Sequence, residues 1–562
     1  MSAFKPSSRA PALFRRNPRR PLLPLLLVGL LVLGAVGGGY LLLSRRSGGG
    51  DPQRIEVVRA CDVPVEILER VWRGYVPGRT GDVLTIEQLP NQYNTRHSTP
   101  FPYTQDVPLV LYGPGFIKSG VTSDRTTTVA DLAPTFAELL DFELPTKVDG
   151  RPLREALLPK ERRNGLPKLI FTLVWDGGGD NVLEFWPESW PQLKSLMKNG
   201  TKYTEATVGS SPSITPSIHA TIGTGVFPKK HGLSDTRMRI GNETLDAYEG
   251  GSPKFLRVET LGDLWDRANG NMPLVGMMAR DNWHLGMIGH GAFSEGGDRD
   301  IAVMDDLGEV EFRTSEKFYE LPDYLLGNVG LQEAIDQVDQ RDGEADQRWL
   351  GNPLLPIDGK IRYTPAWSIF QTDKLKQLLT NEGFGADEVP DLFFVNYKST
   401  DLAGHEWNMV ELEEKETLEE QDRQIEELLR FLDDTVGRKN YVLAMTADHG
   451  MTPYPEETGG WNIIMSETSA DIEKKFDKVT PDVPLILSNR GYQIMLNKKE
   501  VERNNVDPAD IAAFLRTYTI GDNAPNEQAL GDFENRTEER VFTTALTPEE
   551  LKEALDCART SA

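Results

Sequence analysis

The stretch KLIFTLVWDG, residues 168–177, decides the fold of this chain. It is an almost unbroken apolar run that closes on an aspartate, as expected of a strand buried on both faces of a sheet. Three more runs share this character: VPLVLYG (107–113), DLFFVNY (391–397) and YVLAMTADHG (441–450). Helix-like segments at 126–142 and 418–437 alternate with them. The alternation predicts an α/β fold with a largely parallel central sheet.

Three of these predicted strands end in side chains of the metal-binding type. Asp176 closes the first, Asp401 and His405 follow DLFFVNY, and Asp448 and His449 close the last. In an open parallel sheet, ligands gather beyond the carboxyl ends of the strands. A mixture of carboxylates and imidazoles suits zinc, and manganese fits nearly as well. One Asp-Gly or Asp-His pair would indicate only a turn, but three such strand ends in one chain predict a metal centre.

A hydroxyl-rich stretch, SSPSITPSIHATIGTG (210–225), offers the nucleophile. A hydroxyl beside bound metal ions can lose its proton and attack phosphorus. A helix is predicted to begin here, and its first N–H groups would favour a phosphate. We take Thr215 as the nucleophile. Its rivals are Ser211, Ser213 and Ser217, each of which could instead cap a helix or stabilise a turn.

Together these motifs resemble the alkaline phosphatase superfamily. The matching residues are Asp176, Thr215-x-x-x-His219 with TG at 224–225, His231-Gly232, Asp401-x-x-x-His405 and Asp448-His449-Gly450-Met451. The resemblance is strongest to the type I phosphodiesterase/nucleotide pyrophosphatase branch and to related phosphatases with a threonine nucleophile. It implies an alkaline phosphatase-like three-layer sandwich, two divalent metal ions and small phosphate-ester substrates.

The resemblance also implies which residues hold each ion. One zinc would be bound by Asp176, Thr215, Asp448 and His449. The other would be bound by Asp401, His405 and a histidine that follows later in the family. No histidine follows His449 in this chain, whose seven histidines are His97, His219, His231, His284, His290, His405 and His449.

The wording that surrounds the missing histidine in the family occurs near the N-terminus instead. HSTPFPYTQDVPLVLYGPGF (97–116) is followed by VADLAPTFAELL (129–140) and DGRPL (149–153). We therefore predict a circular permutation, in which His97 completes the second metal site. Residues 54–158 would be the usual C-terminal part of the fold, 159–167 a linker, and 168–562 the remainder, with a cap or insertion at about 236–365. Such a rearrangement is tolerated where the original termini lie close together at the surface.

Two cysteines, Cys61 and Cys557, lie near the two ends of the body. In a permuted domain the new ends were once adjacent, so the hypothesis predicts that these cysteines are neighbours. We expect a disulfide between them in an oxidising compartment.

The resemblance assigns substrate contacts less directly. Arg280 and Asn282 stand where the threonine phosphatases carry a Lys-x-Arg pair, and Thr236 replaces a phosphate-contacting asparagine. These departures concern the ester that is used, not the metal ligands. Among the remaining histidines, His219 and His231 are expected to orient or pack, while His284 and His290 lie in the same segment as Arg280.

The N-terminus predicts a membrane anchor. Residues 21–43 form an uncharged run long enough to cross a bilayer core of about 30 Å. The basic tail of residues 1–20 would stay in the cytoplasm, 44–53 would be a tether, and the catalytic domain of 54–562 would lie outside the cell membrane. A cleaved signal peptide is the alternative. The net charge of −25 argues against nucleic acid as a bulk partner.

These features predict a membrane-anchored, metal-dependent phosphoric ester hydrolase that forms a covalent phospho-threonine. A sulfatase of the same superfamily would need a Cys or Ser in a C/S-x-P-x-R run, and the site reads TPSIH instead. Two alternatives stay open. One is a transferase that moves a phospho-headgroup to an envelope lipid or glycan, and the other is a metal-free binding protein with a decayed site.

Overall fold

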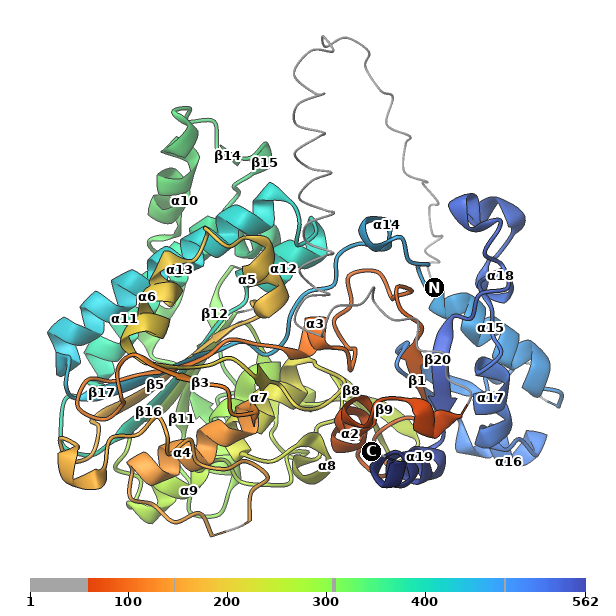
Figure 1. Ribbon diagram of the computed structural model, residues 1–562. Coiled ribbons are helices and arrows are strands. Elements are labelled where there is room, and N and C mark those ends of the chain that lie inside the picture. Colours follow the sequence, from red (N-terminus) through yellow and green to blue (C-terminus); the bar gives the residue numbers. More distant parts are fainter. Residues whose placement is uncertain (1–58, 146, 306–309, 480–481, 562) are drawn as a thin grey trace, which may run out of the picture. The chain divides into compact units, whose positions relative to one another are not determined.

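The central sheet is built around the strand that the sequence singles out. Figure 1 shows the computed structural model, which describes residues 59–145, 147–305, 310–479 and 482–561, all within the compact unit Gly50–Ala562. Strand β5 (Leu169–Trp175) lies between β16 (Asp391–Tyr397) and β17 (Tyr441–Thr446), parallel to both. Strands β10 (Val275–Ala279) and β11 (Asp300–Asp305) continue the parallel order beyond β16.

The strands beyond β17 differ from the expectation of a largely parallel sheet. Strand β2 (Leu109–Tyr112) forms as predicted, but it runs antiparallel to β17, and β6 (Thr201–Tyr203) runs antiparallel to β2. Strand β3 (Val121–Ser123) then pairs with β6. The sheet is therefore mixed. The difference arises because an apolar run shows that both faces of a strand are buried but does not show its direction.

Helices cover both faces of this sheet, which gives the expected three layers (Figure 1). Along β5, Ile170 and Val174 point into one core, whereas Phe171, Leu173 and Trp175 point into the other. One face is covered by α4 (Leu132–Leu139), α7 (Thr215–Thr224) and α9 (Leu261–Ala268). The other is covered by α6 (Pro191–Asn199), α11 (Pro365–Glu382) and α13 (Leu412–Leu432).

The segment 236–365 is only in part a cover over the sheet. Strands β10 and β11 and helix α9 all belong to it, and both strands are integral to the central sheet. Their apolar runs are short, since β10 reads VGMMA and β11 reads DIAVMD with an aspartate at each end. For this reason the sequence interpretation as a cap or insertion was wrong for these elements.

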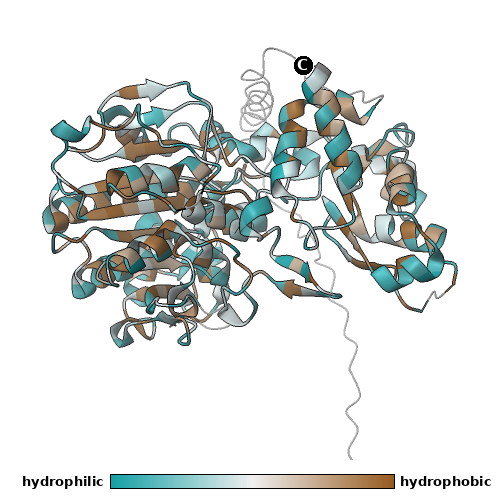
Figure 2. Ribbon diagram, turned by 90° about the horizontal axis from the view of Figure 1, so that it is seen from below, coloured by the Kyte–Doolittle hydropathy of each residue, from teal (hydrophilic) through white to brown (hydrophobic). Residues whose placement is uncertain are grey.

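A second, smaller antiparallel sheet was not foreseen from the sequence. Its order is β18 (Ile486–Asn489), β19 (Gln493–Leu496), β1 (Val83–Glu87) and β20 (Phe542–Leu546). Its buried apolar residues belong to two separate clusters, and Figure 2 shows how apolar and polar residues alternate along the ribbon. Helices α15 (Met465–Phe476) and α17 (Pro508–Leu515) contribute to one core, and α2 (Val65–Gly74) and α19 (Pro548–Ser561) to the other. Strand β1 therefore comes from the start of the described chain and pairs with strands from its end.

The two ends of the described chain meet without a covalent bond. Helix α19 packs on α2 and on the turn η1 (Ala60–Asp62), with Leu551 and Leu555 fully buried. Arg559 forms an ion pair with Glu69 at 2.7 Å. Cys61 lies on η1 and Cys557 on α19, so the two cysteines belong to elements that pack together, as the hypothesis predicted. The predicted disulfide between them is not formed in this structure. Packing and this ion pair hold the ends together instead.

The predicted membrane anchor at 21–43, the basic tail and the tether lie outside the described residues. Among the helices that the structure does describe, none combines the length and the apolar character needed to cross a bilayer.

Candidate metal centre

Three buried aspartates converge at the carboxyl edge of the central sheet. Asp176 follows β5, Asp448 follows β17, and Asp401 lies on α12 (Ser399–Glu406), the helix after β16. The strand register explains why they meet, since Trp175 pairs with Tyr397 and Val174 with Thr446, so that the three strands end at the same level. The strand-end argument from sequence is thereby matched by the geometry.

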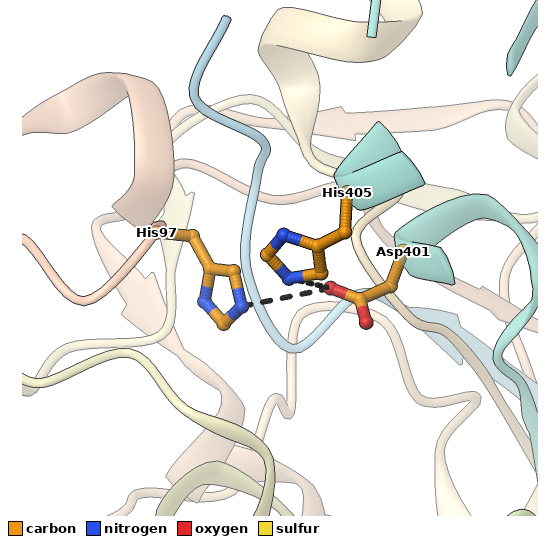
Figure 3. A group of neighbouring side chains, drawn as sticks. All are labelled: His97, Asp401 and His405. Carbon is orange, nitrogen blue, oxygen red and sulfur yellow. Dashed lines mark ion pairs between the residues drawn. The ribbon is translucent and has the colours of Figure 1, made fainter. Parts of the chain in front are cut away.

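The first candidate metal group consists of His97, Asp401 and His405, shown in Figure 3. Asp401 Oδ1 lies 3.5 Å from His97 Nε2 and 3.3 Å from His405 Nε2. All three ligand atoms lie within 4.8 Å of one another. The early histidine thus lies beside carboxylate and imidazole ligands that come some 300 positions later in the printed sequence.

The second candidate group consists of Asp176, Asp448 and His449. His449 Nε2 lies 3.5 Å from Asp176 Oδ1 and 3.3 Å from Asp448 Oδ2. The Gly177 amide donates to Asp448 Oδ1 at 3.2 Å, which fixes the other carboxylate oxygen toward the group. The rings of His97 and His449 stack with their centroids 3.4 Å apart, so the two groups are adjacent.

Hydrogen bonds hold the histidines in the tautomer that binds metals. His97 Nδ1 donates to the Ser213 carbonyl at 2.8 Å, and His449 Nδ1 donates to the Gly450 carbonyl at 3.0 Å. Each bond leaves the Nε2 lone pair directed at the carboxylates. Burial lowers the pKa of His449 to about 4 and lowers that of His97 as well. Both imidazoles are therefore neutral near pH 7, as metal coordination requires.

The donor atoms fit a pair of divalent ions. Asp401 Oδ1, Asp448 Oδ2 and His449 Nε2 are buried and have no hydrogen-bond partner among the described residues. Buried polar atoms are normally satisfied, so this concentration of orphaned atoms indicates a missing cation. Burial and the neighbouring Asp176 also raise the pKa of Asp448, which indicates the same deficit of positive charge.

Thr215 lies at the first turn of α7, next to both groups. Lys398 Nζ donates to Thr215 Oγ1 at 3.2 Å, and the same ammonium contacts Asp176 and Asp401. Of the rival hydroxyls, Ser213 Oγ donates to the His97 carbonyl at 2.6 Å and so supports that histidine. Ser217 Oγ has no hydrogen-bond partner in the described structure. Ser211 Oγ makes no hydrogen bond to the centre among the described residues.

The sequence interpretation missed two polar residues, Asn396 and Lys398. Asn396 Nδ2 donates to Asp176 Oδ2 at 2.9 Å, and Lys398 Nζ lies 2.6 Å from Asp176 Oδ1. Burial alone would raise the pKa of Asp176, but the Lys398 ammonium, His284 and His449 together outweigh it and hold that pKa below its usual range. Both residues stand in NYKSTD, directly before Asp401. The argument that ligands gather at the carboxyl ends of parallel strands would have found both residues if it had been applied to every polar residue near the end of β16.

Two further histidines lie behind the centre. His219 Nδ1 donates to the Thr215 carbonyl at 2.8 Å, in keeping with its expected orienting role. His284 lies between Asp176 and Asp281, with Nε2 3.6 Å from Asp176 Oδ2 and Nδ1 3.2 Å from Asp281 Oδ1. Burial opposes the charged imidazole, but the two carboxylates prevail and raise the pKa of His284 to about 9. His284 is thus a cationic partner of Asp176.

No hydrogen bond or ion pair of the described residues joins the three predicted substrate contacts directly to the metal ligands. Thr236 accepts a hydrogen bond from Arg490 at 2.9 Å and lies beside Asp235. Arg280 and Asn282 flank Asp281, whose partner His284 contacts Asp176. Arg280 Nε and Asn282 Oδ1 are buried without a partner among the described residues.

Comparison with known proteins gives consistent matches. The profile of the family described as type I phosphodiesterase / nucleotide pyrophosphatase matches residues 170–553. A protein of Myroides odoratus named calcium-transporting ATPase is 24% identical over 407 residues, 62% of this chain and 72% of the relative. Alkaline phosphatase PafA of Elizabethkingia meningoseptica is 22% identical over 422 residues, 64% of this chain and 75% of the relative.

A crystal structure of PafA shares the fold, with a TM-score of 0.51 at 19% identity, over 62% of this chain and 76% of that chain. A shorter match joins this chain to GPI ethanolamine phosphate transferase 1 of Candida glabrata. It is 28% identical over 137 residues, 24% of this chain and 14% of that protein.

Proposed function

Because the chain belongs to the type I phosphodiesterase / nucleotide pyrophosphatase family, we propose that it is a metal-dependent phosphoric ester hydrolase with Thr215 as its nucleophile. The observation that carries this proposal is the meeting of two carboxylate–histidine groups next to one helix-terminal hydroxyl. The substrate is a small phosphate ester, either a monoester or a diester.

Two divalent ions, zinc or manganese, complete the centre in this proposal. One is held by His97, Asp401 and His405, and the other by Asp176, Thr215, Asp448 and His449. When bound, such ions lower the pKa of a neighbouring hydroxyl and stabilise the oxygen that leaves phosphorus.

The chain's own residues then position and carry the reaction. Thr215 Oγ1 attacks phosphorus in line with the departing alkoxide, and the phospho-threonine that forms is hydrolysed by water. His219 fixes the first turn of α7 through the Thr215 carbonyl. The N-terminal end of α7 supplies partial positive charge where the phosphate must bind. Lys398 adds a full positive charge at the nucleophile.

Replacing the nucleophile tests the proposal. Thr215→Ala is expected to abolish hydrolysis of both aryl phosphate and bis-aryl phosphate while the protein keeps its zinc, measured by elemental analysis. Ser217→Ala is the matched control on the same helix and should keep turnover within about tenfold, equivalent to 1.4 kcal/mol of barrier. Undiminished turnover in the Thr215 variant would rule out this mechanism, and the ratio of the two wild-type rates would identify the preferred ester.

A phospho-headgroup transferase is the second candidate. It is favoured by the match to the GPI ethanolamine phosphate transferase and by the apolar segment at 21–43. The two reactions share the phospho-threonine and differ only in whether water or an acceptor alcohol attacks it. An assay with labelled phospholipid donor and lipid or glycan acceptors separates them, because only a transferase labels the acceptor.

The remaining features of the protein are also proposals. We propose that residues 21–43 anchor it in the cell membrane with the N-terminus in the cytoplasm, which the basic tail supports. We also propose that residues 54–158 are the permuted C-terminal part of the family fold. Support comes from the contact of His97 with Asp401, the pairing of β1 with β20, and the packing of α19 on η1.

A further inference from the structure

A lysine lies at the midpoint of the metal centre. Lys398 is 6% exposed, and its Nζ contacts Asp176 Oδ1 at 2.6 Å, Asp401 Oδ2 at 2.8 Å and Thr215 Oγ1 at 3.2 Å. Asp401 belongs to the first candidate metal group, and Asp176 and the proposed ligand Thr215 to the second, so the ammonium contacts both groups. The side chain follows β16 directly, so the strand end that delivers Asp401 delivers the ammonium as well.

The ammonium affects the two groups differently. In the first group, Lys398 forms an ion pair with Asp401 Oδ2, while Asp401 Oδ1 faces His97 and His405. The three ligand atoms of that group are therefore left open. In the second group, Lys398 bonds the same oxygen, Asp176 Oδ1, that faces His449.

The other atoms of the second group are also partly committed. Asn396 bonds the remaining Asp176 oxygen, and the Thr215 hydroxyl accepts from Lys398. Only Asp448 Oδ2 and His449 Nε2 keep their full capacity there. A second ion would have to share Asp176 with a fixed positive charge.

The charges of the centre also favour one divalent ion over two. Asp176, Asp401 and Asp448 can supply three negative charges, and Lys398 neutralises one of them. The cationic His284 does not change this balance, because its second partner Asp281 offsets it. A single divalent ion balances what is left. A second divalent ion must enter a buried site that is already neutral, where repulsion between cations is poorly screened.

We propose that Lys398 makes the two metal sites unequal. One divalent ion binds tightly to His97, Asp401 and His405, and the ion at Asp176, Asp448 and His449 binds at least about tenfold more weakly because the ammonium opposes it. This inference rests on the proposed function for the identity of the two sites. It adds a positioning residue that sets metal occupancy.

A zinc titration of metal-free protein tests the inference, with calorimetry and elemental analysis as readouts. The wild type should show one tight site and one site at least about tenfold weaker. Lys398→Met removes the charge but keeps much of the side-chain volume, and should tighten the weaker site at least tenfold. The matched control is Lys374→Met, which changes a lysine that is also 6% exposed but lies on α11 outside the centre. It should titrate as the wild type does.

Two results would overturn the inference: equal affinities in the wild type, or an unchanged second affinity in Lys398→Met. Lys398→Gln serves as a second variant, with circular dichroism to verify folding, in case the methionine variant does not fold. The outcome is separable from that of the proposed function. Unequal sites combined with full turnover in Thr215→Ala would refute the nucleophile but leave the role of Lys398 intact.

Discussion

At the scale of single residues, several side chains of the centre hold one polar atom in a hydrogen bond to the backbone and keep the other polar atom for a metal ion. His97 and His449 each donate Nδ1–H to a backbone carbonyl, and Asp448 receives the Gly177 amide. The remaining atom of each side chain, Nε2 of the histidines and Oδ2 of Asp448, is thereby held toward the other ligand atoms in one rotamer. Such preorganisation lowers the entropy cost of binding an ion, since few groups have to be ordered when it arrives.

His97 gives a direct test at this scale. His97→Ala removes one of three ligand atoms, so the affinity for the tightly bound zinc should fall by more than the roughly 10–100-fold seen when an outer-shell partner is lost. Hydrolysis should fall with it. Zinc titration and rate measurements on the same samples check this.

The control for this variant is His290→Gln. His290 is also buried, but it pairs with Asp263 outside the centre. It should keep the zinc affinity of the wild type. An unchanged zinc affinity in His97→Ala would remove His97 from the ligand set.

At the scale of elements, the second sheet contains one buried carboxyl whose protonation affects the stability of the fold. Strand β1 lies between β19 and β20 and contributes residues to the cores on both faces. Glu87 ends this strand, is 1% exposed, and its Oε1 has no partner in the described structure. Burial raises the pKa of Glu87 to about 8. The strand is therefore most stable with this carboxyl protonated.

The sign of the pH dependence follows from linkage. The folded pKa of about 8 exceeds the ordinary value of 4.5, so the folded state binds the proton more tightly and stability falls as pH rises from about 4.5 to 8. Glu87→Gln removes this loss. The free energy of unfolding of the variant should exceed that of the wild type by about 5 kcal/mol at pH 9 and by little at pH 4.5.

Urea unfolding followed by circular dichroism at both pH values measures this difference. Glu553→Gln, at an exposed position of α19, should match the wild type at both. An equal effect of Glu87→Gln at pH 4.5 and pH 9 would contradict the assignment.

At the scale of the whole molecule, the chain order and the spatial order differ. The strand nearest the start of the described chain is completed by strands from its end, and His97 joins ligands from beyond residue 400. The segment 159–167, which follows α4 and leads into β5, is in contrast largely exposed. Contacts rather than covalent continuity thus define the unit.

A rearranged chain tests this view. Joining Ser561 to Arg59 by a short flexible linker and opening the chain within 159–167 restores the order expected of the family. This chain should fold, bind zinc with wild-type stoichiometry and retain hydrolysis, because no buried contact is cut.

The opposite outcome is also informative. A matched rearrangement that opens the chain inside β5 should not fold, since β5 is buried throughout its length. If the chain opened within 159–167 fails in the same way, the linker is part of the folding unit and the permutation hypothesis loses its support.

Residue types along the chain were enough to predict the α/β class, the four central strands and the ligand types at the strand ends, because burial on both faces and metal chemistry leave local signatures in residue type. It did not determine the direction of β2, the strands within 236–365 or the second sheet, whose short segments depend on pairing with distant partners. The contact of His97 with Asp401 was predicted only through the family resemblance, and the bridging position of Lys398 emerged only in the folded chain. Each depends on distances between residues far apart in sequence, which no local pattern encodes.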